Sequence, residues 1–546
     1  MTNEFRNSFA ENVFKFKYAQ GPGDTWAKLS ERLVDDVCGT RNNMITAIMS
    51  EAERKELTQF IKEMKFLPGG RYLYYAGRPF KAYNNCFLLR AEEDTREEWS
   101  NVTWRAMSCL MTGGGIGIDY SRLRASGKAL SRTGGTSSGP IPLMSAINEI
   151  GRNVMQGGSR RSAIYASLNW QHEDIHKFLT IKNWSTVVKE EKLKDFSFPG
   201  PLDMTNISVN YDDASLVGGL DNNSVFLTNI RQAMETGEPG FSFNFGSKQN
   251  ETLRNACTEV TSEDDSDVCN LGSVNLANID SIDQLKRVVE LGSKFLVCGT
   301  LRADLPYDKV YQVRAKNRRL GLGLMGIHEW LLKRNYSYEV TPELHKWLEI
   351  YRDESKRSAD EHCDRFFISH PVAYRAIAPT GSIGILAGTT TGIEPLFAVA
   401  YKRRFLTEGT KWKYQYVVDG TADLLINKFG VKPESIESAL DLSENYEKRI
   451  AFQASLQDYV DMSISSTINL PAWGTARNNE KEVGAFAATL AKYAPRLRGF
   501  TCYPDGSRGG QPLTAVPYEE ALKHKDVVYE ENDICDISGK GGSCGV

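Results

Sequence analysis

Three polar side chains at alternate positions have the types and spacing that could do chemistry: Asn255, Cys257 and Glu259. In an extended segment they project to the same side, because side chains alternate with a period of two. A carboxylate beside a thiol raises the cysteine pKa, so the group is unsuited to a Cys–His type of nucleophile. It suits one-electron chemistry, in which Glu259 moves protons and Cys257 cycles as a neutral sulfur species. The alternative interpretation is a loop with two structural cysteines, Cys257 and Cys269.

The run that begins at Cys269 reads C-N-L-G-S-V-N-L. Together with N-x-C-x-E it closely resembles the active-site segment of the ribonucleotide reductases, in their large or sole catalytic subunit. The resemblance implies that Cys257 becomes a thiyl radical, while Asn255 and Glu259 hold and deprotonate the ribose hydroxyls. It also implies that Cys269 is half of a redox pair that reduces the substrate, and that Cys86, far upstream, is the other half.

Composition limits the alternatives. The 546 residues allow two or three ordinary domains or one large α/β barrel. A hydrophobic content of 41% and a charged content of 25% are typical of a soluble globular protein. A net charge of −3 gives no reason to expect nucleic acid or an anionic membrane as a partner. We find no transmembrane-length apolar run and no signal-peptide core, so we expect a cytoplasmic protein, in the host cytoplasm if the source is a virus.

Because we find no secretory targeting, we expect a reducing compartment. The chain has ten cysteines and none form a C-x-x-C pair, which disfavours a zinc ribbon. In a reducing compartment cysteines are buried small hydrophobes, metal ligands or redox catalysts. We assign no metal site.

Apolar residues recur at helical spacing in residues 1 to about 65, which predicts an N-terminal helical region. Family members often carry an extra N-terminal regulatory domain that binds ATP or dATP. Only 85 residues precede Cys86, and we expect that domain to be absent. The run G-L-G-L-M-G-I-H at 321–328 is interpreted as tight, glycine-spaced packing in a helix.

A glycine-rich loop spans residues 112–127 and matches neither G-x-G-x-x-G nor the Walker pattern. Taken alone, it is typical of a strand start with close backbone packing. It also resembles the effector-binding region of the family. By this resemblance Arg124 contacts the effector phosphate, and Asp94 or Glu93 holds the effector ribose.

The segment 169–178 contains His172-Glu173-x-x-His176, which matches the zinc metalloprotease motif H-E-x-x-H. Two histidines at i and i+4 face the same way on a helix. No third ligand follows at the usual short spacing, however. The segment also resembles the W-x-x-x-D-I-x-x-F helix of the reductases, which we favour.

Several segments resemble substrate-binding parts of the family. The run A-P-T-G-S-I-G-I-L at 378–386 places hydroxyls and N–H groups before an apolar run, as a phosphate-binding helix start does. An ordinary helix cap is the alternative. With T-T-T-G-I-E-P after it, the run resembles the substrate-phosphate loop. The substrate-binding residues implied are Asn85, Arg160 of a mobile loop at 153–163, and Thr380, Gly381, Ser382 and Ile383.

The chain ends in a glycine-rich segment that contains Cys535 and Cys544. Flexible glycines around two late thiols suit a swinging arm. The family uses such a tail to pass reducing equivalents from thioredoxin or glutaredoxin to the buried disulfide. The alternative is a disordered end with incidental cysteines. We expect three regions: helices at 1–65, the reductase barrel at 66–513 and the redox-active tail at 514–546.

The resemblance implies a fold of the α/β class, a ten-stranded barrel made of two five-stranded parallel halves, with Cys257 on a central finger loop. It implies reduction of ribonucleoside di- or triphosphates to deoxyribonucleotides. The residues of these motifs look most like those of the adenosylcobalamin-dependent reductases. Cys502-Tyr503 leaves one tyrosine where subunit-dependent enzymes have a relay of two. A separate ferritin-like radical-generating subunit, with Tyr503 as the relay, is the alternative.

The chain is short for the family, which implies a homodimer with a nucleotide effector, a dNTP or ATP, at the interface. From another class, the chain could be a non-catalytic nucleotide-binding regulator. The presence of every catalytic residue argues against that function.

Overall fold

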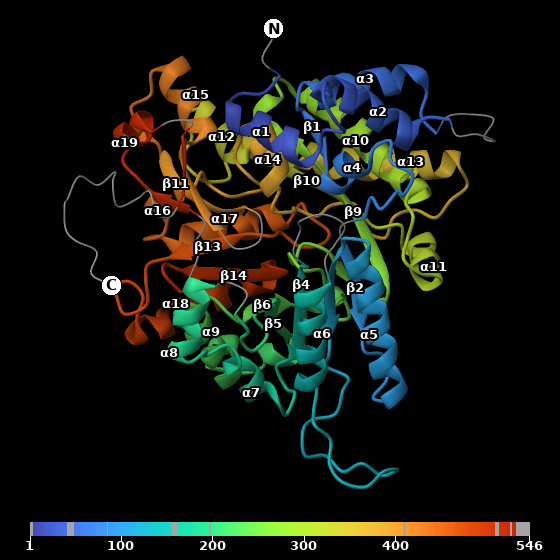
Figure 1. Ribbon diagram of the computed structural model, residues 1–546, viewed down its shortest axis with the longest axis vertical. Helices are drawn as coiled ribbons and strands as arrows, with labels where there is room; N and C mark the ends of the chain where they lie inside the picture. The colour runs from blue at the N-terminus through green and yellow to red at the C-terminus, as the bar shows by residue number, and fades with distance from the viewer. Residues whose placement is uncertain are drawn as a thin grey trace.

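The computed structural model describes residues 4–40, 48–84, 86–154, 162–195, 198–407, 411–507, 513–524 and 527–530. Helices α1 (Ser8–Lys17), α2 (Trp26–Cys38) and α3 (Glu51–Lys62) form the N-terminal region. Thr25 caps α2, and Ser50 and Glu53 form a capping box on α3, which explains where these helices begin. Figure 1 shows these helices gathered at one end of the molecule with α10 (Ile282–Arg302) and α13 (Pro342–Arg365).

Five strands form the first half of the barrel, and each pairs in parallel with the next. Nearly all of their residues are buried, on both faces, as expected of parallel strands covered by helices. The strands are β2 (Cys86–Arg90), β3 (Gly115–Asp119), β4 (Ile164–Asn169), β5 (Thr205–Tyr211) and β6 (Gly240–Phe243). The helices between them are α5 (Arg96–Met111), α6 (Ile141–Asn153), α7 (Ile175–Thr180), α8 (Thr186–Lys194) and α9 (Ser224–Thr236).

The second half repeats the pattern with β9, β10, β13 and β14. The pairs β9–β10 and β13–β14 are parallel, and isolated parallel bridges join Leu322 to Arg375 and Ile377 to Ile464. The strands are β9 (Asp267–Asn275), β10 (Leu320–Met325), β13 (Thr467–Leu470) and β14 (Gly499–Pro504). The helices are α10, α11 (Asp308–Asn317), α12 (Ile327–Lys333), α13, α14 (Gly381–Ala387), α15 (Gly420–Phe429), α16 (Ala439–Leu442), α17 (Tyr446–Gln457) and α18 (Val483–Tyr493).

The two halves meet at two antiparallel seams. Strand β2 pairs with β9, and β6 pairs with β14, so the ring of strands closes on itself. A short strand β1 (Phe66–Pro68) and helix α4 (Gly70–Tyr75) precede the ring, and β1 extends it along β9. With β1 included, the sheet has ten strands and is predominantly parallel, so the predicted ten-stranded α/β fold is confirmed. The second half has four assigned strands, and the isolated bridges of residues 375 and 377 stand in place of a fifth.

One element was predicted wrongly. Residues 320–325 form strand β10 and not a helix, and α12 begins only at Ile327. The alternating glycines have a packing reason. A Cβ on Gly321 would lie 3.1 Å from the Cys269 Sγ atom, and one on Gly323 would lie 2.7 Å from the Ala376 carbonyl oxygen. The two glycines therefore reflect close contacts with the segments that flank β10, β9 on one side and Ala376 on the other. Sequence alone does not distinguish such packing in a strand from glycine-spaced packing in a helix.

A finger loop connects β6 to β9 and enters the barrel. Its short hairpin consists of β7 (Leu253–Arg254) and β8 (Thr261–Ser262), and Cys257 lies between these strands. The first half of the barrel contacts it through the Asn206 amide, which donates to the Ala256 carbonyl at 3.4 Å. The second half contacts it through the Ser463 N–H group, which donates to the Glu259 carbonyl at 2.8 Å. The loop is therefore held by both halves.

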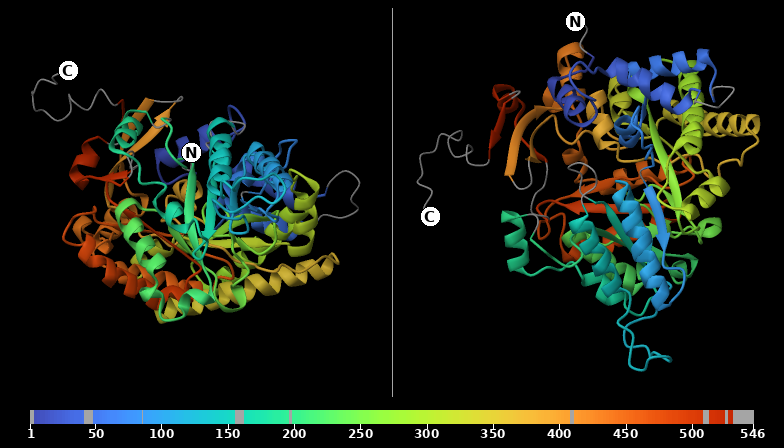
Figure 2. Two further views of the ribbon diagram at one scale, coloured as in Figure 1. Left: turned by 90° about the horizontal axis from the view of Figure 1, so that it is seen from below. Right: turned by 45° about the vertical axis from the view of Figure 1, so that its right-hand side comes forward.

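A small antiparallel sheet lies outside the barrel in the order β15-β11-β12-β16. Strands β11 (Ala400–Thr407) and β12 (Lys411–Val418) form a hairpin, and β15 (Leu513–Ala515), α19 (Tyr518–Lys523) and β16 (Val528–Glu530) add to it. Figure 2 shows these elements at the edge of the molecule. The segment predicted as tail, 514–546, thus begins with structured elements. Within the described ranges no helix has the length and apolar character needed to cross a bilayer.

The close approach of the finger loop to β3 gives a testable prediction. A Cβ on Gly117 would lie 1.7 Å from the Arg254 carbonyl oxygen, so Gly117→Ala must displace the loop. We expect a loss of roughly 1–3 kcal/mol in the free energy of unfolding, measured by urea denaturation. Gly484→Ala on α18 is the matched control, because a Cβ there meets nothing within 4 Å. Equal stability of the two variants would contradict the described packing.

Candidate active site

Two cysteines from distant parts of the chain face each other at the seam between the halves. The register of β2 and β9 places Cys86 directly opposite Cys269. Directly opposed residues of antiparallel strands have Cα atoms about 4.5–5.5 Å apart, which lies within the range that a disulfide spans. Both side chains are buried, and burial raises the pKa of both thiols. The pair can therefore hold two electrons as neutral thiols and release them by forming a disulfide.

Asn255 links the finger loop to this pair. Its side-chain amide donates to the Cys86 Sγ atom at 3.0 Å, and its carbonyl oxygen accepts from the Val260 N–H group at 3.0 Å. The side chain is buried, so both bonds lie away from bulk water. Asn255 is therefore oriented by the backbone of its own loop.

Glu259 is a buried carboxyl group beside Cys86. The Cys86 thiol donates to its Oε1 atom at a distance of 3.9 Å, and its Oε2 atom has no hydrogen-bond partner. Burial raises the pKa of Glu259 to about 7, although the nearby Asn255 amide and the Cys86 thiol oppose the shift. A carboxyl group with this pKa can take up and release a proton near neutral pH.

Cys257 differs from its neighbours in exposure. Asn255, Ala256 and Glu259 are buried, whereas the Cys257 side chain is exposed. The next residue, Thr258, has a φ of 69°, a left-handed conformation that turns the chain sharply at this point. The loop therefore presents one thiol outward while it keeps the amide and the carboxyl group inside.

Sequence reasoning missed the buried cation that fixes this loop. Arg254 donates to the Asn244 side chain at 2.8 Å and to the Arg498 carbonyl at 3.1 Å, so it joins the loop to the residue directly before β14. Burial, together with the charge of Arg498, lowers the pKa of Arg254 to about 9. An arginine directly before Asn255 was the only available signal, and it does not reveal contacts with residues so far along the chain.

The predicted phosphate loop joins the same interior. Ala378 belongs to the buried apolar cluster that contains Cys86 and Cys269, and Thr380 follows two residues later with a φ of 50°. The Thr380 hydroxyl accepts from the Gly392 N–H group at 2.8 Å and does not cap α14. The Thr380 side chain therefore does not act as an ordinary helix cap. Gly381 and Ile383 lie in the first turn of α14.

A contact missed by sequence reasoning reaches this loop from the N-terminal region. The Lys17 ammonium on α1 donates to the Ser382 hydroxyl at 3.1 Å. Arg6, just before α1, donates to the Gly388 carbonyl at the other end of α14 at 2.9 Å. Periodicity predicts α1 but not its partner.

The predicted effector residues form an ion pair between Arg124 and Asp94. Arg124 and Lys128 line a hollow with six other residues, so the hollow contains two cations. The structure pairs Arg124 with Asp94 and gives no such bond to Glu93. The full lining is Leu123, Arg124, Ala125, Lys128, Ala129, Gln171, His172 and Glu173.

His172 is held by backbone groups. Its Nε2 atom lies 2.8 Å from the Leu123 carbonyl, and its Nδ1 atom accepts from the Asp174 N–H group at 3.1 Å. It precedes α7, whereas His176 lies within α7, so the two histidines do not share one helix face. In the described part of the chain, no group of three His, Cys, Asp or Glu side chains could hold a metal ion.

Tyr503 lies on β14, opposite Asn469 of β13, and is partly exposed. Four predicted site residues lie outside the described residues: Asn85, Arg160, Cys535 and Cys544.

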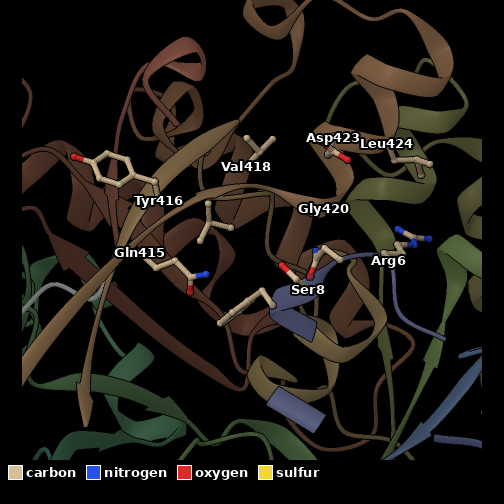
Figure 3. Close-up of a pocket in the computed structure, with 11 residues that line it drawn as sticks. Arg6, Ser8, Gln415, Tyr416, Val418, Gly420, Asp423 and Leu424 are labelled. Atoms are coloured by element: carbon tan, nitrogen blue, oxygen red, sulfur yellow. The ribbon is translucent and has the colours of Figure 1, made fainter. Parts of the chain in front are cut away.

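A further hollow lies outside the barrel, where Arg6 and Ser8 face β12 and α15 (Figure 3). It contains none of the predicted catalytic residues.

Comparisons with known proteins agree with this geometry. The family model described as "Ribonucleotide reductase, barrel domain" matches residues 84–199, 212–346 and 372–491. A "Vitamin B12-dependent ribonucleoside-diphosphate reductase" of Mycobacterium tuberculosis is 27% identical, over 86% of this chain and 74% of the relative. A "Putative adenosylcobalamin-dependent ribonucleoside-triphosphate reductase" of Mycobacterium phage D29 is 28% identical, over 92% and 93%.

Among solved structures, the "Actinobacillus ureae class Id ribonucleotide reductase alpha subunit" superposes with a TM-score of 0.71. It is 16% identical and covers 92% of this chain and 97% of that one. At this identity the likeness concerns the fold.

Proposed function

The chain belongs to the ribonucleotide reductase family, and from this premise we propose that it reduces ribonucleoside di- or triphosphates to 2′-deoxyribonucleotides by thiyl-radical chemistry started by adenosylcobalamin. One observation carries the proposal. The Cys86–Cys269 pair lies at the barrel seam, directly beside a loop that presents Cys257 between Asn255 and Glu259. We place the enzyme in the cytoplasm, where thiol reductants operate.

The residues divide the reaction among them. As a thiyl radical, Cys257 takes the 3′ hydrogen of the ribose and later returns it. Glu259 accepts the proton of the 3′ hydroxyl, and Asn255 orients the hydroxyls. The 2′ hydroxyl leaves as water. Cys86 and Cys269 supply two electrons and two protons and become a disulfide, so that one ribonucleotide and one dithiol give one deoxyribonucleotide, one disulfide and one water.

The residues around Cys257 fit an adenosylcobalamin partner. When bound, this cofactor supplies the one-electron oxidant that removes the hydrogen atom of a thiol. Cys257 is the residue that would face it, because its thiol is exposed while its neighbours are buried. The names of the relatives from Mycobacterium tuberculosis and phage D29 support the same cofactor.

The alternative is a separate ferritin-like subunit that generates the radical. It would use Tyr503 as a relay, but the neighbouring position is Cys502 and not a second tyrosine. A non-catalytic nucleotide-binding regulator is a remote alternative, because it would not require the set of Cys257, Asn255, Glu259 and the opposed cysteine pair.

Substrate and reductant sites follow from the same proposal. We assign the substrate phosphates to residues 380–383, the base to Arg160 and a further substrate contact to Asn85. We assign re-reduction of the Cys86–Cys269 disulfide to Cys535 and Cys544, with thioredoxin or glutaredoxin as the external reductant.

We further propose a homodimer with a dNTP or ATP effector at its interface. Helix α5 exposes Trp104, Met107 and Met111 along one face, with exposed fractions of 57%, 38% and 64%. Three large apolar side chains on one exposed helix face indicate a protein interface, and a second copy would cover them. Asp94 lies two residues before α5 and forms the ion pair with Arg124. The proposed effector-phosphate residue is therefore connected to the helix that carries the proposed dimer face.

The first test is reduction of a ribonucleotide by dithiothreitol and an effector, with and without adenosylcobalamin. We expect turnover only with the cofactor, and we expect Tyr503→Phe to leave it unchanged. Turnover that requires an added ferritin-like subunit, and that Tyr503→Phe abolishes, would replace the cobalamin proposal with the relay alternative.

The pKa of Glu259 predicts a pH profile. The carboxylate needed to accept a proton is lost as pH falls through about 7, because burial has raised this pKa above its ordinary value. We expect kcat/KM to fall below that pH with a slope of one, and Glu259→Gln to lose about 100-fold or more in turnover. Glu263→Gln, an exposed carboxyl of the same loop, should keep the wild-type profile. An unchanged inflection in Glu259→Gln would assign it to another group.

The dimer proposal predicts that Trp104→Glu produces monomers in analytical ultracentrifugation and weakens effector binding, because the charge would be buried against the second copy. Phe429→Glu is the matched control, because Phe429 is similarly exposed, at 54%, and lies on α15. A wild-type dimer fraction that no effector changes, or equal behaviour of the two variants, would count against the interface.

A further inference from the structure

A second cluster of thiols lies outside the active site, between the N-terminal helices and the barrel. Cys38 is the last residue of α2, Cys298 belongs to α10 and His362 to α13. Both cysteines have no exposed surface, and His362 is 3% exposed. None of the three takes part in the proposed reaction.

The three side chains lie close together. The Cys298 Sγ atom lies 3.6 Å from the His362 Nε2 atom, and Cys38 is near enough to Cys298 for each thiol to alter the pKa of the other. Arg302, one helical turn after Cys298, donates to the Gly39 carbonyl directly after Cys38. The cluster thus joins the end of α2 to the C-terminal part of α10.

The environment makes the two sulfur atoms unequal. Burial acts to raise the pKa of Cys298, but the bonds from Cys38 and His362 and the charge of Arg302 outweigh it and lower that pKa to about 6. Burial and the bond to Cys298 raise the pKa of Cys38. The contact with the His362 ring makes Cys298 the attacking thiol in the steps proposed below, with Cys38 as its partner.

The position of Cys38 connects it to the predicted phosphate loop. Trp26 at the start of α2 packs against Phe14 of α1, with ring centroids 6.2 Å apart. Helix α1 in turn places Lys17 on Ser382 at 3.1 Å. A covalent bond between Cys38 and Cys298 would fasten this chain of contacts to the barrel.

We propose that Cys38 and Cys298 form a second dithiol, separate from the catalytic pair, which hydrogen peroxide oxidises to a disulfide that fastens α2 to α10. The proposal does not depend on the proposed function. A peroxide is small enough to enter through local opening of the α2 end, where a larger disulfide reagent would be slow.

The chemistry balances in two steps. The Cys298 thiolate attacks one oxygen of hydrogen peroxide, which gives a sulfenic acid and hydroxide, and the hydroxide takes up the proton that Cys298 released, which gives the first water. The Cys38 thiol then attacks the Cys298 sulfur atom, an S–S bond forms, and water leaves. Two thiols and one peroxide are converted to one disulfide and two waters.

The test uses the full-length reduced protein, treated with hydrogen peroxide under native conditions, alkylated and digested for mass spectrometry. We expect a cross-linked peptide containing Cys38 and Cys298, distinct from the Cys86–Cys269 peptide. Oxidation should raise the melting temperature and slow proteolysis within residues 8–62 by about tenfold. His362→Gln should slow formation of the Cys38–Cys298 cross-link but not of the catalytic one.

Cys38→Ser and Cys363→Ser are the matched variants, because Cys363 is a fully buried neighbour of His362 on α13. The cross-link and the thermal shift should persist in Cys363→Ser and disappear in Cys38→Ser. Exhaustively oxidised wild type without a Cys38–Cys298 cross-link would overturn the proposal whether or not the variants fold. An equal thermal shift in Cys38→Ser would also overturn it.

Discussion

The antiparallel register between β2 and β9 is the constraint on which the rest of the structure depends. It closes the ring of strands on one side, and it places Cys86 opposite Cys269. A shift of one residue would place the two thiols on opposite faces of the sheet, because side chains alternate along a strand. The same strand register therefore sets both the closure of the barrel and the spacing of the redox pair. The glycines of β10 serve the same register, since Gly321 leaves room beside the Cys269 sulfur atom.

Burial gives the site its electrostatic character. The finger loop is held inside the barrel by Gly117, Arg254 and Ser463, and this removes Glu259 from water. Desolvation then raises the Glu259 pKa toward neutrality and keeps the Cys86 and Cys269 thiols protonated. Neutral thiols donate hydrogen atoms, whereas thiolates act as nucleophiles. The same low-dielectric interior thus favours radical reduction over nucleophilic catalysis.

Features that depend on residues close together in the sequence could be predicted from the sequence. Alternation in N-x-C-x-E predicts that Asn255, Cys257 and Glu259 project to one side. Asn255 and Glu259 both contact Cys86, but the chain turns at residues 256–258 and Cys257 is exposed, so the prediction is wrong for Cys257. Long-range contacts gave no signal. Arg254 meets Arg498, Lys17 meets Ser382, and β11 and β12 pair with segments beyond residue 512. The glycine run at 320–325 was misinterpreted as a helix because close packing in a strand and in a helix both select glycine. The family resemblance supplied what local physics could not, namely that Cys86 and Cys269 belong together.

The central claim is that Cys257 removes the 3′ hydrogen of the ribose. The most direct measurement compares kcat/KM for a ribonucleotide carrying hydrogen or deuterium at C3′, in the wild type and in Cys257→Ser. We expect the ratio of kcat/KM for the hydrogen form to kcat/KM for the deuterium form to exceed one in the wild type. Cys257→Ser should show no turnover but should still bind nucleotide. A ratio of one together with turnover by Cys257→Ser would show that the 3′ hydrogen is not transferred to this thiol.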